Sequence, residues 1–370
     1  MPITVAALRE TAAGERRVAI TPEMAKKLHG KGLRVLLERG AGTAAGFPDA
    51  AYADADFADA ADVLAQADLL ACVLPPEDAV FGQLREGALV VGQLRPYGAA
   101  SRVAALAARR LTAFALELLP RTTRAQAMDV LSSQAAVAGY RAMLIAAEAA
   151  PKFFPMLTTA AGTIRPSKVL VIGAGVAGLQ AIATARRLGA QTEGYDVRPE
   201  TREQVESLGA KFLDLGVSAA GSGGYARELS AEERAAQQQA LADHLKSFDV
   251  VVSTAAVPGR PAPKILTAAM VEGMKPGALI VDLAAESGGN CELTRPGERI
   301  EHGGVVILGP LNLPAGAPLH ASEMYARNVF NFVELLVRDG ELKPDFDDEL
   351  VAKSCLSHAG ETRFPAPQGG

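Results

Sequence analysis

Residues 168–180 read Lys-Val-Leu-Val-Ile-Gly-Ala-Gly-Val-Ala-Gly-Leu-Gln, and an Ala-rich stretch leads from them to Gly-Tyr-Asp196. An apolar run, the turn Gly173-x-Gly175-x-x-Gly178, a helical segment and a strand ending in a carboxylate are the parts of a dinucleotide-binding βαβ unit, in order. The first helical N–H groups would face a pyrophosphate. Asp196 stands where such units place the acid that binds a ribose 2′-OH. The stretch predicts dinucleotide binding; the alternative is a Gly-rich turn that binds nothing.

The composition is typical of a globular chain with sizeable cores. It has 370 residues, of which 49% are hydrophobic and 21% charged, and a formal net charge of −5. No basic block is present, so we expect no nucleic-acid partner. Three scattered cysteines fit neither a disulfide framework nor a metal site, and the start lacks a signal-peptide pattern, so we expect the cytoplasm and no metal. No run reaches the ~18 apolar residues of a membrane span.

Short β-rich runs alternate with helical stretches, which predicts an α/β fold with two doubly wound, Rossmann-like parallel-sheet domains joined by long helices. The first series of strands is expected at 3–7, 33–38, 68–73, 88–93 and 112–118. The second series is expected at 168–172, 191–195, 211–213, 249–253, 278–283 and 304–308. Helices are expected at 22–30, 99–109 and 231–246.

Two further helices decide the expected domain organisation. The Ala-rich stretch 132–150 reads as a helix that crosses from the first domain to the second, and 321–338 reads as a helix near the C-terminus. We expect residues 1–131 plus 312–370 to form one discontinuous domain, and residues 140–311 to form the other. The cleft between two such domains is the default place for chemistry.

The connection between the strands near 212 and 250 is unusually long. It begins with the Gly-rich segment 215–229, whose glycines would let it move. Long stretches without structure in compact domains are often lids over a site. The alternative is a surface insertion without a function.

A polar segment, Pro120-Arg-Thr-Thr-Arg-Ala-Gln-Ala-Met-Asp-Val-Leu-Ser-Ser-Gln134, follows the last strand of the first series. Ligands gather at the carboxyl ends of parallel strands. Arg121 can donate to a carboxamide or phosphate, with Asp129 holding it in place. Gln126 and Ser132 offer neutral hydrogen bonds. Spacing alone equally allows a helix start with Ser132 as N-cap and an Arg121–Asp129 surface ion pair.

This polar segment resembles the nicotinamide-binding loop of the NAD(H)-binding subunits of proton-translocating NAD(P) transhydrogenases, a family that includes alanine dehydrogenases. The resemblance covers nearly the whole chain. Further matching segments are Gly14-Glu-Arg-Arg-Val-Ala-Ile-Thr-Pro22, 173–185, Glu203-Gln-Val-Glu-Ser-Leu-Gly209, Gly223-Gly-Tyr-Ala226, Asp282-Leu-Ala and Gly288-Gly-Asn-Cys291.

The resemblance implies an activity, cofactors and partners. The chain would bind NAD(H) and exchange hydride with NADP(H) on the NADP(H)-binding domain of a partner beta subunit, while protons cross a membrane through membrane-spanning subunits. It would form a homodimer that docks on the cytoplasmic face of these partners.

The resemblance also implies roles for single residues. Arg121, Gln126, Asp129 and Ser132 would position the nicotinamide and its ribose, with Tyr140 supporting the loop. The expected cofactor-binding residues of the second domain are Gly173, Gly175, Val176, Gly178, Gln180, Asp196, Val197, Arg198, Tyr225, Ala255, Val257 and Gly259, with Tyr225 on the mobile segment.

The acid at position 196 favours NAD(H), because a carboxylate accepts hydrogen bonds from a ribose 2′-OH and repels a 2′-phosphate. Arg198 nearby could argue for NADP(H). We weigh Asp196 more heavily because it occupies the strand end itself. The first domain has no comparable Gly motif after its first strand, so we expect it to hold no second dinucleotide.

The alternative within the family is an amino-acid dehydrogenase, whose chemistry moves substrate protons and needs a positioned acid or base. Alanine dehydrogenases resemble this chain but carry a Lys on the third N-terminal strand and a His on the fourth. The matching stretches 69–76 and 90–97 contain neither. Hydride exchange between two nicotinamides requires no such base, only alignment of the rings and exclusion of water. The sequence therefore favours transhydrogenation.

Overall fold

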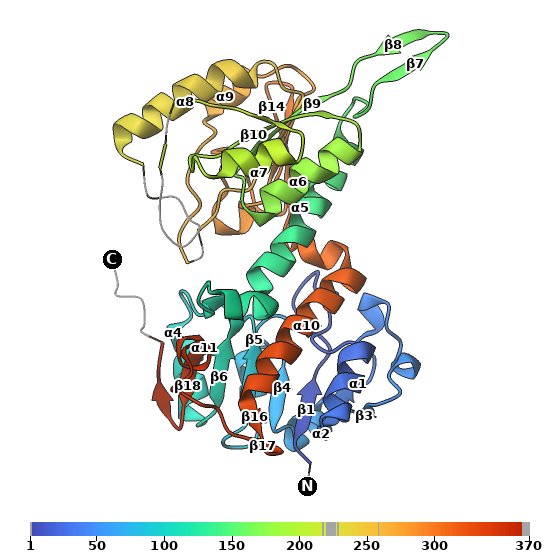
Figure 1. Cartoon of the computed structure of the whole chain (residues 1–370), viewed down its shortest axis with the longest axis vertical. Helices are drawn as coiled ribbons and strands as arrows, with labels where there is room; N and C mark the ends of the chain where they lie inside the picture. The colour runs from blue at the N-terminus through green and yellow to red at the C-terminus, as the bar shows by residue number, and fades with distance from the viewer. Residues whose placement is uncertain (1, 217, 220–226, 228, 258, 365–370) are drawn as a thin grey trace. The chain divides into compact units, whose positions relative to one another are not determined.

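The computed structural model describes residues 2–216, 218–219, 227, 229–257 and 259–364 (Figure 1). The chain divides into two compact units, one made of the residues up to Gln134 together with those from Ala315 onward, the other of Ala135–Pro314. Each unit is built around one large, mainly parallel sheet. The predicted fold class, an α/β chain with two Rossmann-like sheets, is confirmed.

The sheet of the first unit has the strand order β3-β2-β1-β4-β5-β6-β18-β19. Its strands are β1 (Thr4–Ala7), β2 (Arg34–Glu38), β3 (Asp56–Ala58), β4 (Leu69–Ala71), β5 (Leu89–Gly92), β6 (Thr112–Ala115), β18 (Cys355–His358) and β19 (Glu361–Thr362). The first six are parallel, but β18 pairs antiparallel with β6 and β19 antiparallel with β18. These two antiparallel edge strands were not predicted. The order reverses at β1 and β4, which places the topological switch point there.

Helices cover both faces of this sheet. They are α1 (Pro22–Gly30), α2 (Ala60–Gln66), α3 (Asp78–Phe81), α4 (Ala100–Ala108), α10 (Pro318–Leu336) and α11 (Glu349–Ser354), and a small hairpin, β16 (Val337–Arg338) and β17 (Glu341–Leu342), follows α10. Short 3₁₀ turns lie at η1 (Thr43–Ala45) and η2 (Asp49–Ala51). Val5 and Ala7 of β1 share a core with α1 and α10, whereas Ala6 packs with α2 and α4. Both faces of the strands are buried, which is why they read as continuous apolar runs.

The sheet of the second unit has the order β11-β10-β9-β12-β13-β15-β14. Its strands are β9 (Lys168–Ile172), β10 (Gln191–Tyr195), β11 (Lys211–Phe212), β12 (Val250–Ser253), β13 (Leu279–Asp282), β14 (Arg299–His302) and β15 (Val305–Leu308). The last strand in this order, β14, is antiparallel to β15 and was not predicted. The order reverses between β9 and β12, so the Gly-rich turn after β9 lies at the switch point, where α/β sheets bind ligands.

The helices of the second unit also lie on both faces of its sheet. They are α6 (Val176–Arg187), α7 (Thr201–Ser207), α8 (Ala231–Leu245) and α9 (Ala268–Glu272), with 3₁₀ turns at η5 (Ala285–Ser287) and η6 (Leu313–Gly316). Val169 and Val171 pack with α6, and Leu170 and Ile172 pack with α8 and α9. A two-stranded hairpin, β7 (Leu157–Thr159) and β8 (Gly162–Ile164), extends from this unit (Figure 1).

The long helix α5 (Val130–Ala149) starts two residues before the predicted 132–150, and α10 starts three before the predicted 321–338. Within the second unit α5 packs closely on α6, since a Cβ at Gly139 would lie 2.0 Å from the carbonyl oxygen of Ala177. In the described part of the chain, α5 is the one helix whose length and apolar composition would suffice to cross a membrane, a property that buried core helices share.

Candidate active site

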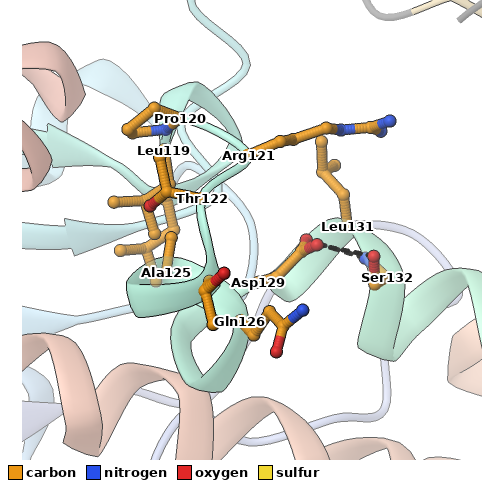
Figure 2. A pocket seen from close by; sticks show the side chains of 11 residues that line it. Leu119, Pro120, Arg121, Thr122, Ala125, Gln126, Asp129, Leu131 and Ser132 are labelled. Carbon is orange, nitrogen blue, oxygen red and sulfur yellow. Dashed lines mark hydrogen bonds between the residues drawn. The ribbon is translucent and has the colours of Figure 1, made fainter. Parts of the chain in front are cut away.

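The polar segment after β6 lines a cavity within the first unit. The predicted strand 112–118 ends at Ala115, and two 3₁₀ turns, η3 (Leu116–Leu118) and η4 (Thr123–Met128), lead to α5. A cavity of about 510 Å³ opens on this segment (Figure 2). Its lining residues are Leu116, Leu119, Pro120, Arg121, Thr122, Thr123, Ala125, Gln126, Asp129, Leu131 and Ser132. The structure thus brings together the four side chains that the sequence selected here.

Asp129 caps the first turn of α5. Its carboxylate accepts hydrogen bonds from the Ser132 amide at 2.9 Å and from the Ser132 hydroxyl at 2.5 Å. The alternative interpretation, in which Ser132 is the N-cap, is therefore wrong. The Asp129 carboxylate, one residue before the helix, is the cap. The sequence suggested that Asp129 orients Arg121, whereas these bonds orient Ser132. In Figure 2 the Arg121 side chain extends away from the Asp129–Ser132 pair.

Buried neighbours fix the loop that carries Gln126. Ala125 and Met128 lie in the core of the first unit, while Gln126 and Asp129 line the cavity. This division follows from the three residues per turn of a 3₁₀ helix, which places Ala125 and Met128 on one side and Gln126 and Asp129 on another. The loop is therefore a rigid platform for its polar side chains.

A buried polar cluster supports the start of α5, and no role was predicted for its members. Arg17 pairs with Glu15 at 2.7 Å, and its Nη1 donates to Oε1 of Gln134 at 2.7 Å. Gln134 in turn donates to the carbonyl of Ala321 in α10 at 3.1 Å. All three cluster residues are buried, so their charges and amides compensate one another. The motifs around 14–22 and 120–134 contained these residues, but nothing in the sequence indicated that they meet.

The Gly-rich turn of the second unit has the predicted geometry. A Cβ at Gly178 would lie 1.7 Å from the carbonyl oxygen of Gly173, so only glycine allows α6 to start this close to β9. Gly173 has φ +94. A Cβ at Gly175 would meet no atom within 4 Å, so its backbone borders open space at the N-terminus of α6. Such a space, next to the positive end of a helix dipole, fits the pyrophosphate of a dinucleotide.

Asp196 lies against this turn, at the end of β10. Its Oδ2 accepts from the Ala174 amide at 2.7 Å. Arg198 donates to both carboxylate oxygens, through its backbone amide and Nε to Oδ1 at 2.9 Å and through Nη2 to Oδ2 at 2.7 Å. The side chain of Asp196 is only 6% exposed, and that of Arg198 only 14%. The acid and the arginine, which the sequence weighed against each other, thus form one partly buried pair.

The segment after β12 is fixed by a buried asparagine for which no role was predicted. Asn290 donates to the carbonyls of Ala255 and Pro263 at 2.7 and 2.9 Å and accepts from the amide of Ala255 at 3.1 Å. Its Oδ1 also accepts from the Ser253 hydroxyl at 2.6 Å. Since Asn290 is fully buried and its amide is bonded on both sides, it is a rigid clamp on Ala255. The surrounding Gly288-Gly-Asn-Cys291 motif was the only signal for it.

The remaining predicted cofactor residues are distributed over the second unit. Val176 begins α6 and is exposed, Gln180 lies one turn further, and Val197 accepts a backbone bond from Ala219. Val257 and Gly259 follow Ala255 in the same segment, and Gly259 has φ +73. Tyr140 lies on α5 and is exposed. Tyr225, expected on the mobile segment, lies outside the described residues.

The described residues that line the cavity of the first unit offer hydrogen bonds but few groups that could transfer a proton. Its lining holds no Lys, His, Cys or Tyr, and its one acid, Asp129, is bonded to Ser132. The five histidines are all exposed or half-buried and none lines this cavity. Among the described residues no cluster of His, Cys, Asp and Glu could hold a metal ion. The cavity offers hydrogen bonds and one guanidinium, which suit binding more than proton transfer.

Two carboxylates at the carboxyl ends of strands in the first sheet were not anticipated. Glu10 accepts from the backbone amides of Val73 and Leu74 after β4, at 2.6 and 3.2 Å. Burial raises the pKa of Glu10 to about 7, against the lowering by these two bonds. Glu117 binds the amides of Leu94 and Arg95 after β5 in the same way, and burial raises its pKa too. These acids cap the strand ends at which an amino-acid dehydrogenase of this family is expected to carry its Lys and His.

The raised pKa of Glu10 predicts how stability depends on pH. Between pH 4.5 and about 7 the folded chain keeps a proton that the unfolded chain has lost, so stability falls as pH rises through this window. We expect Glu10→Gln, which cannot ionise, to remove this loss of about 3 kcal/mol. Thermal melting of both proteins from pH 4.5 to 8 measures the difference. Identical pH profiles would contradict the assignment, since Glu117 contributes equally to both.

Nearly the whole chain is similar to known proteins. Residues 6–138 match the family described as alanine dehydrogenase/PNT, N-terminal domain, and residues 142–365 match the corresponding C-terminal domain. The chain is 44% identical to the first part of the NAD(P) transhydrogenase alpha subunit of Rhodospirillum rubrum, over 99% of both proteins. It is 30% identical to alanine dehydrogenase of Mycobacterium tuberculosis, over 95% of this chain and 92% of that one. A crystal structure of transhydrogenase from Sinorhizobium meliloti superposes with a TM-score of 0.89 at 44% identity and covers 97% of this chain and 99% of that one.

Proposed function

This chain belongs to the alanine dehydrogenase/PNT family, and from that premise we propose that it is the NAD(H)-binding subunit of a proton-translocating transhydrogenase. It would hold NADH for direct hydride transfer to NADP⁺ on the NADP(H)-binding domain of a partner beta subunit. Membrane-spanning subunits of the same complex would couple this transfer to proton translocation. The family and the full-length similarity to transhydrogenase alpha subunits support an oxidoreductase that binds a nicotinamide nucleotide.

The observation that carries the proposal is the lining of the first unit's cavity. Arg121, Gln126 and the Asp129–Ser132 pair supply donors and acceptors for a carboxamide and a ribose, and no base accompanies them. When bound, NADH supplies the hydride itself. The protein then only needs to align two rings and exclude water, for which a rigid polar platform is sufficient.

The second unit would bind the adenosine diphosphate half. The open space beside Gly175 fits a pyrophosphate, and Asp196 is positioned beside the turn to accept a ribose 2′-OH. Ala255, Val257 and Gly259, on the segment clamped by Asn290, would lie along the cofactor, as would Val176, Gln180, Val197 and Arg198. Tyr140 would support the loop, and Tyr225 would close over the cofactor.

The assembly proposed for the chain is a homodimer on the cytoplasmic face of its membrane partners. The hairpin β7–β8 and the approach to it expose apolar side chains, among them Phe153, Met156, Leu157 and Ile164. Exposed apolar surface of this kind marks an interface, and a second copy is the partner that fits the proposed homodimer. Sedimentation equilibrium tests this point, since a mass of one subunit at micromolar concentration would contradict it.

The second candidate function is an alanine dehydrogenase-like activity, favoured by the 30% identity to the Mycobacterium tuberculosis enzyme. The capped strand ends after β4 and β5, which lack Lys and His, argue against it.

One comparison decides between these functions. The chain is mixed with an NADP⁺-loaded partner domain and NADH, and formation of NADPH is followed. In parallel, the chain alone receives NADH, pyruvate and ammonia. We expect NADPH to form in the first experiment. In the second, we expect no steady oxidation of NADH by pyruvate and ammonia. Steady oxidation by pyruvate and ammonia would favour the dehydrogenase, and tight NADH binding without any exchange would favour an NAD sensor.

A further inference from the structure

Two asparagines of α10 bind the same backbone oxygen of the loop. Asn328 and Asn331 each donate through Nδ2 to the carbonyl of Ala127, at 2.9 and 2.8 Å. They are three residues apart on the helix, so both amides reach the same side. Ala127 directly follows Gln126. We propose that Asn328 and Asn331 are positioning residues that fix the backbone beside Gln126 for hydride transfer, an inference that rests on the proposed function.

The 3₁₀ turn η4 needs such support. It runs for six residues, and 3₁₀ helices longer than about four residues are uncommon because their hydrogen bonds are poorly aligned. A carbonyl in this turn that accepts two bonds from a neighbouring helix is held more firmly than by the turn alone. The helix that supplies them is itself well anchored, with Tyr325, Val329 and Phe332 buried in the core.

The orientation of the Asn328 amide supports a dedicated role. Asn328 is only 8% exposed, and its Oδ1 is buried without a hydrogen-bond partner among the described residues. Leaving an amide oxygen unsatisfied is unfavourable, so a side chain present only for packing would be apolar. Turning the amide over would place Oδ1 against the Ala127 carbonyl and lose the donated bond. The observed orientation therefore leaves Oδ1 without a hydrogen bond and keeps the bond from Nδ2 to the Ala127 carbonyl.

A second tie to the same turn differs in kind. Arg124 pairs with Asp348 at the N-terminus of α11; the Arg124 side chain is 57% exposed, that of Asp348 only 12%. Exposed ion pairs contribute little and weaken with salt. Moreover it holds the tip of a long side chain, whereas the two asparagines hold the backbone itself. Placement of Gln126 within the fraction of an ångström that hydride transfer requires therefore depends on the asparagines.

The test replaces the amide of Asn331, which donates to Ala127, by a carboxylate of the same shape, which can only accept. In Asn331→Asp a carboxylate oxygen faces the Ala127 carbonyl, and because Asn331 is partly exposed, folding is not expected to suffer. Lys31→Gln is the matched control: it changes the charge by the same amount and leaves Glu334, one turn away on α10, without its partner Lys31. Two quantities are measured, hydrogen exchange of the amides in residues 121–129 and single-turnover hydride transfer from bound NADH to the NADP⁺-loaded partner domain.

We expect Asn331→Asp to exchange faster in the loop and to transfer hydride about tenfold more slowly, with the Kd for NADH changed by less than about threefold. Lys31→Gln should match the wild type in both. Unchanged exchange would show that the asparagines do not hold the loop. Unchanged transfer, or a loss entirely in Kd, would overturn the positioning role. A wild-type chain without hydride transfer would instead refute the proposed function, and hydrogen exchange would still decide whether the loop is held.

Discussion

Gln126→Asn should slow hydride transfer by about a hundredfold while NADH still binds. The substitution keeps the amide but withdraws it by one methylene from the cavity that it lines. A displacement of about 1 Å can reduce the rate of a reaction between aligned groups by this factor. Loss of one neutral hydrogen bond to the ground state weakens binding only by about 1 kcal/mol, or about fivefold.

The measurement separates the two effects. Equilibrium binding gives the Kd for NADH, and single-turnover mixing with an NADP⁺-loaded partner gives the rate per bound cofactor. Gln66→Asn, the same shortening at the exposed end of α2, where the side chain accepts from Arg34, is the matched control. If NADH binding collapses and the rate per bound cofactor is unchanged, Gln126 is only a ground-state contact.

The elements around the candidate cofactor site could be predicted from local patterns. The strands expected at 168–172 and 191–195 coincide with β9 and β10. β9 is a continuous, buried apolar run that ends at a glycine, the pattern of a parallel strand, whereas β10, Gln-Thr-Glu-Gly-Tyr, was predicted from its place after the Gly-rich turn and the helix. The Gly-rich turn was equally predictable, because Gly173 and Gly178 each meet a local steric demand and Gly175 leaves open the space beside the helix N-terminus.

The edges of the sheets could not be predicted in the same way. β18 is a short strand that pairs with β6 across more than 200 residues, and no local pattern marks its antiparallel partner. Every residue of the hairpin β7–β8 is exposed, so it lacks the alternation that identifies a half-buried strand. These elements depend on tertiary contacts rather than on local propensity.

The site shows the same division between local and distant information. The loop residues that line the cavity were found because they stand close together in one polar segment. The side chains that hold the loop come from elsewhere, Arg17 from the N-terminal segment and Asn328 and Asn331 from α10. One sequence cannot show that residues 200 positions apart meet. Asp129 illustrates a further limit, since its spacing was compatible with a ligand role or with a surface ion pair to Arg121, whereas the structure makes it the cap of α5.

Asp196→Ala should shift the preference from NADH toward NADPH by about tenfold to a hundredfold. The sequence supported this through the hydrogen bonds that the carboxylate can accept from a ribose 2′-OH and through its repulsion of a 2′-phosphate. The structure adds the partner: Asp196 accepts three hydrogen bonds from Arg198, and removing it releases the Nε and Nη2 groups of that guanidinium at the turn. A charge-assisted bond from a freed arginine to a phosphate contributes about 1.5–3 kcal/mol, which sets the expected factor.

We therefore expect Asp196 to neutralise Arg198, and the Arg198 guanidinium to bind a 2′-phosphate once Asp196 is removed. The double variant Asp196→Ala/Arg198→Ala tests this directly, because it removes the repulsion and the guanidinium together, and it should lose most of the gain in NADPH affinity. Asp214 follows β11 and forms an exposed ion pair with Arg202 of α7. Asp214→Ala breaks that pair and controls for the lost negative charge. Binding of both cofactors is measured at two salt concentrations, since an exposed 2′-phosphate contact should weaken with salt. An unchanged preference in Asp196→Ala would place selectivity elsewhere in the second unit, and a double variant that binds NADPH as well as the single one would show that repulsion alone excludes it.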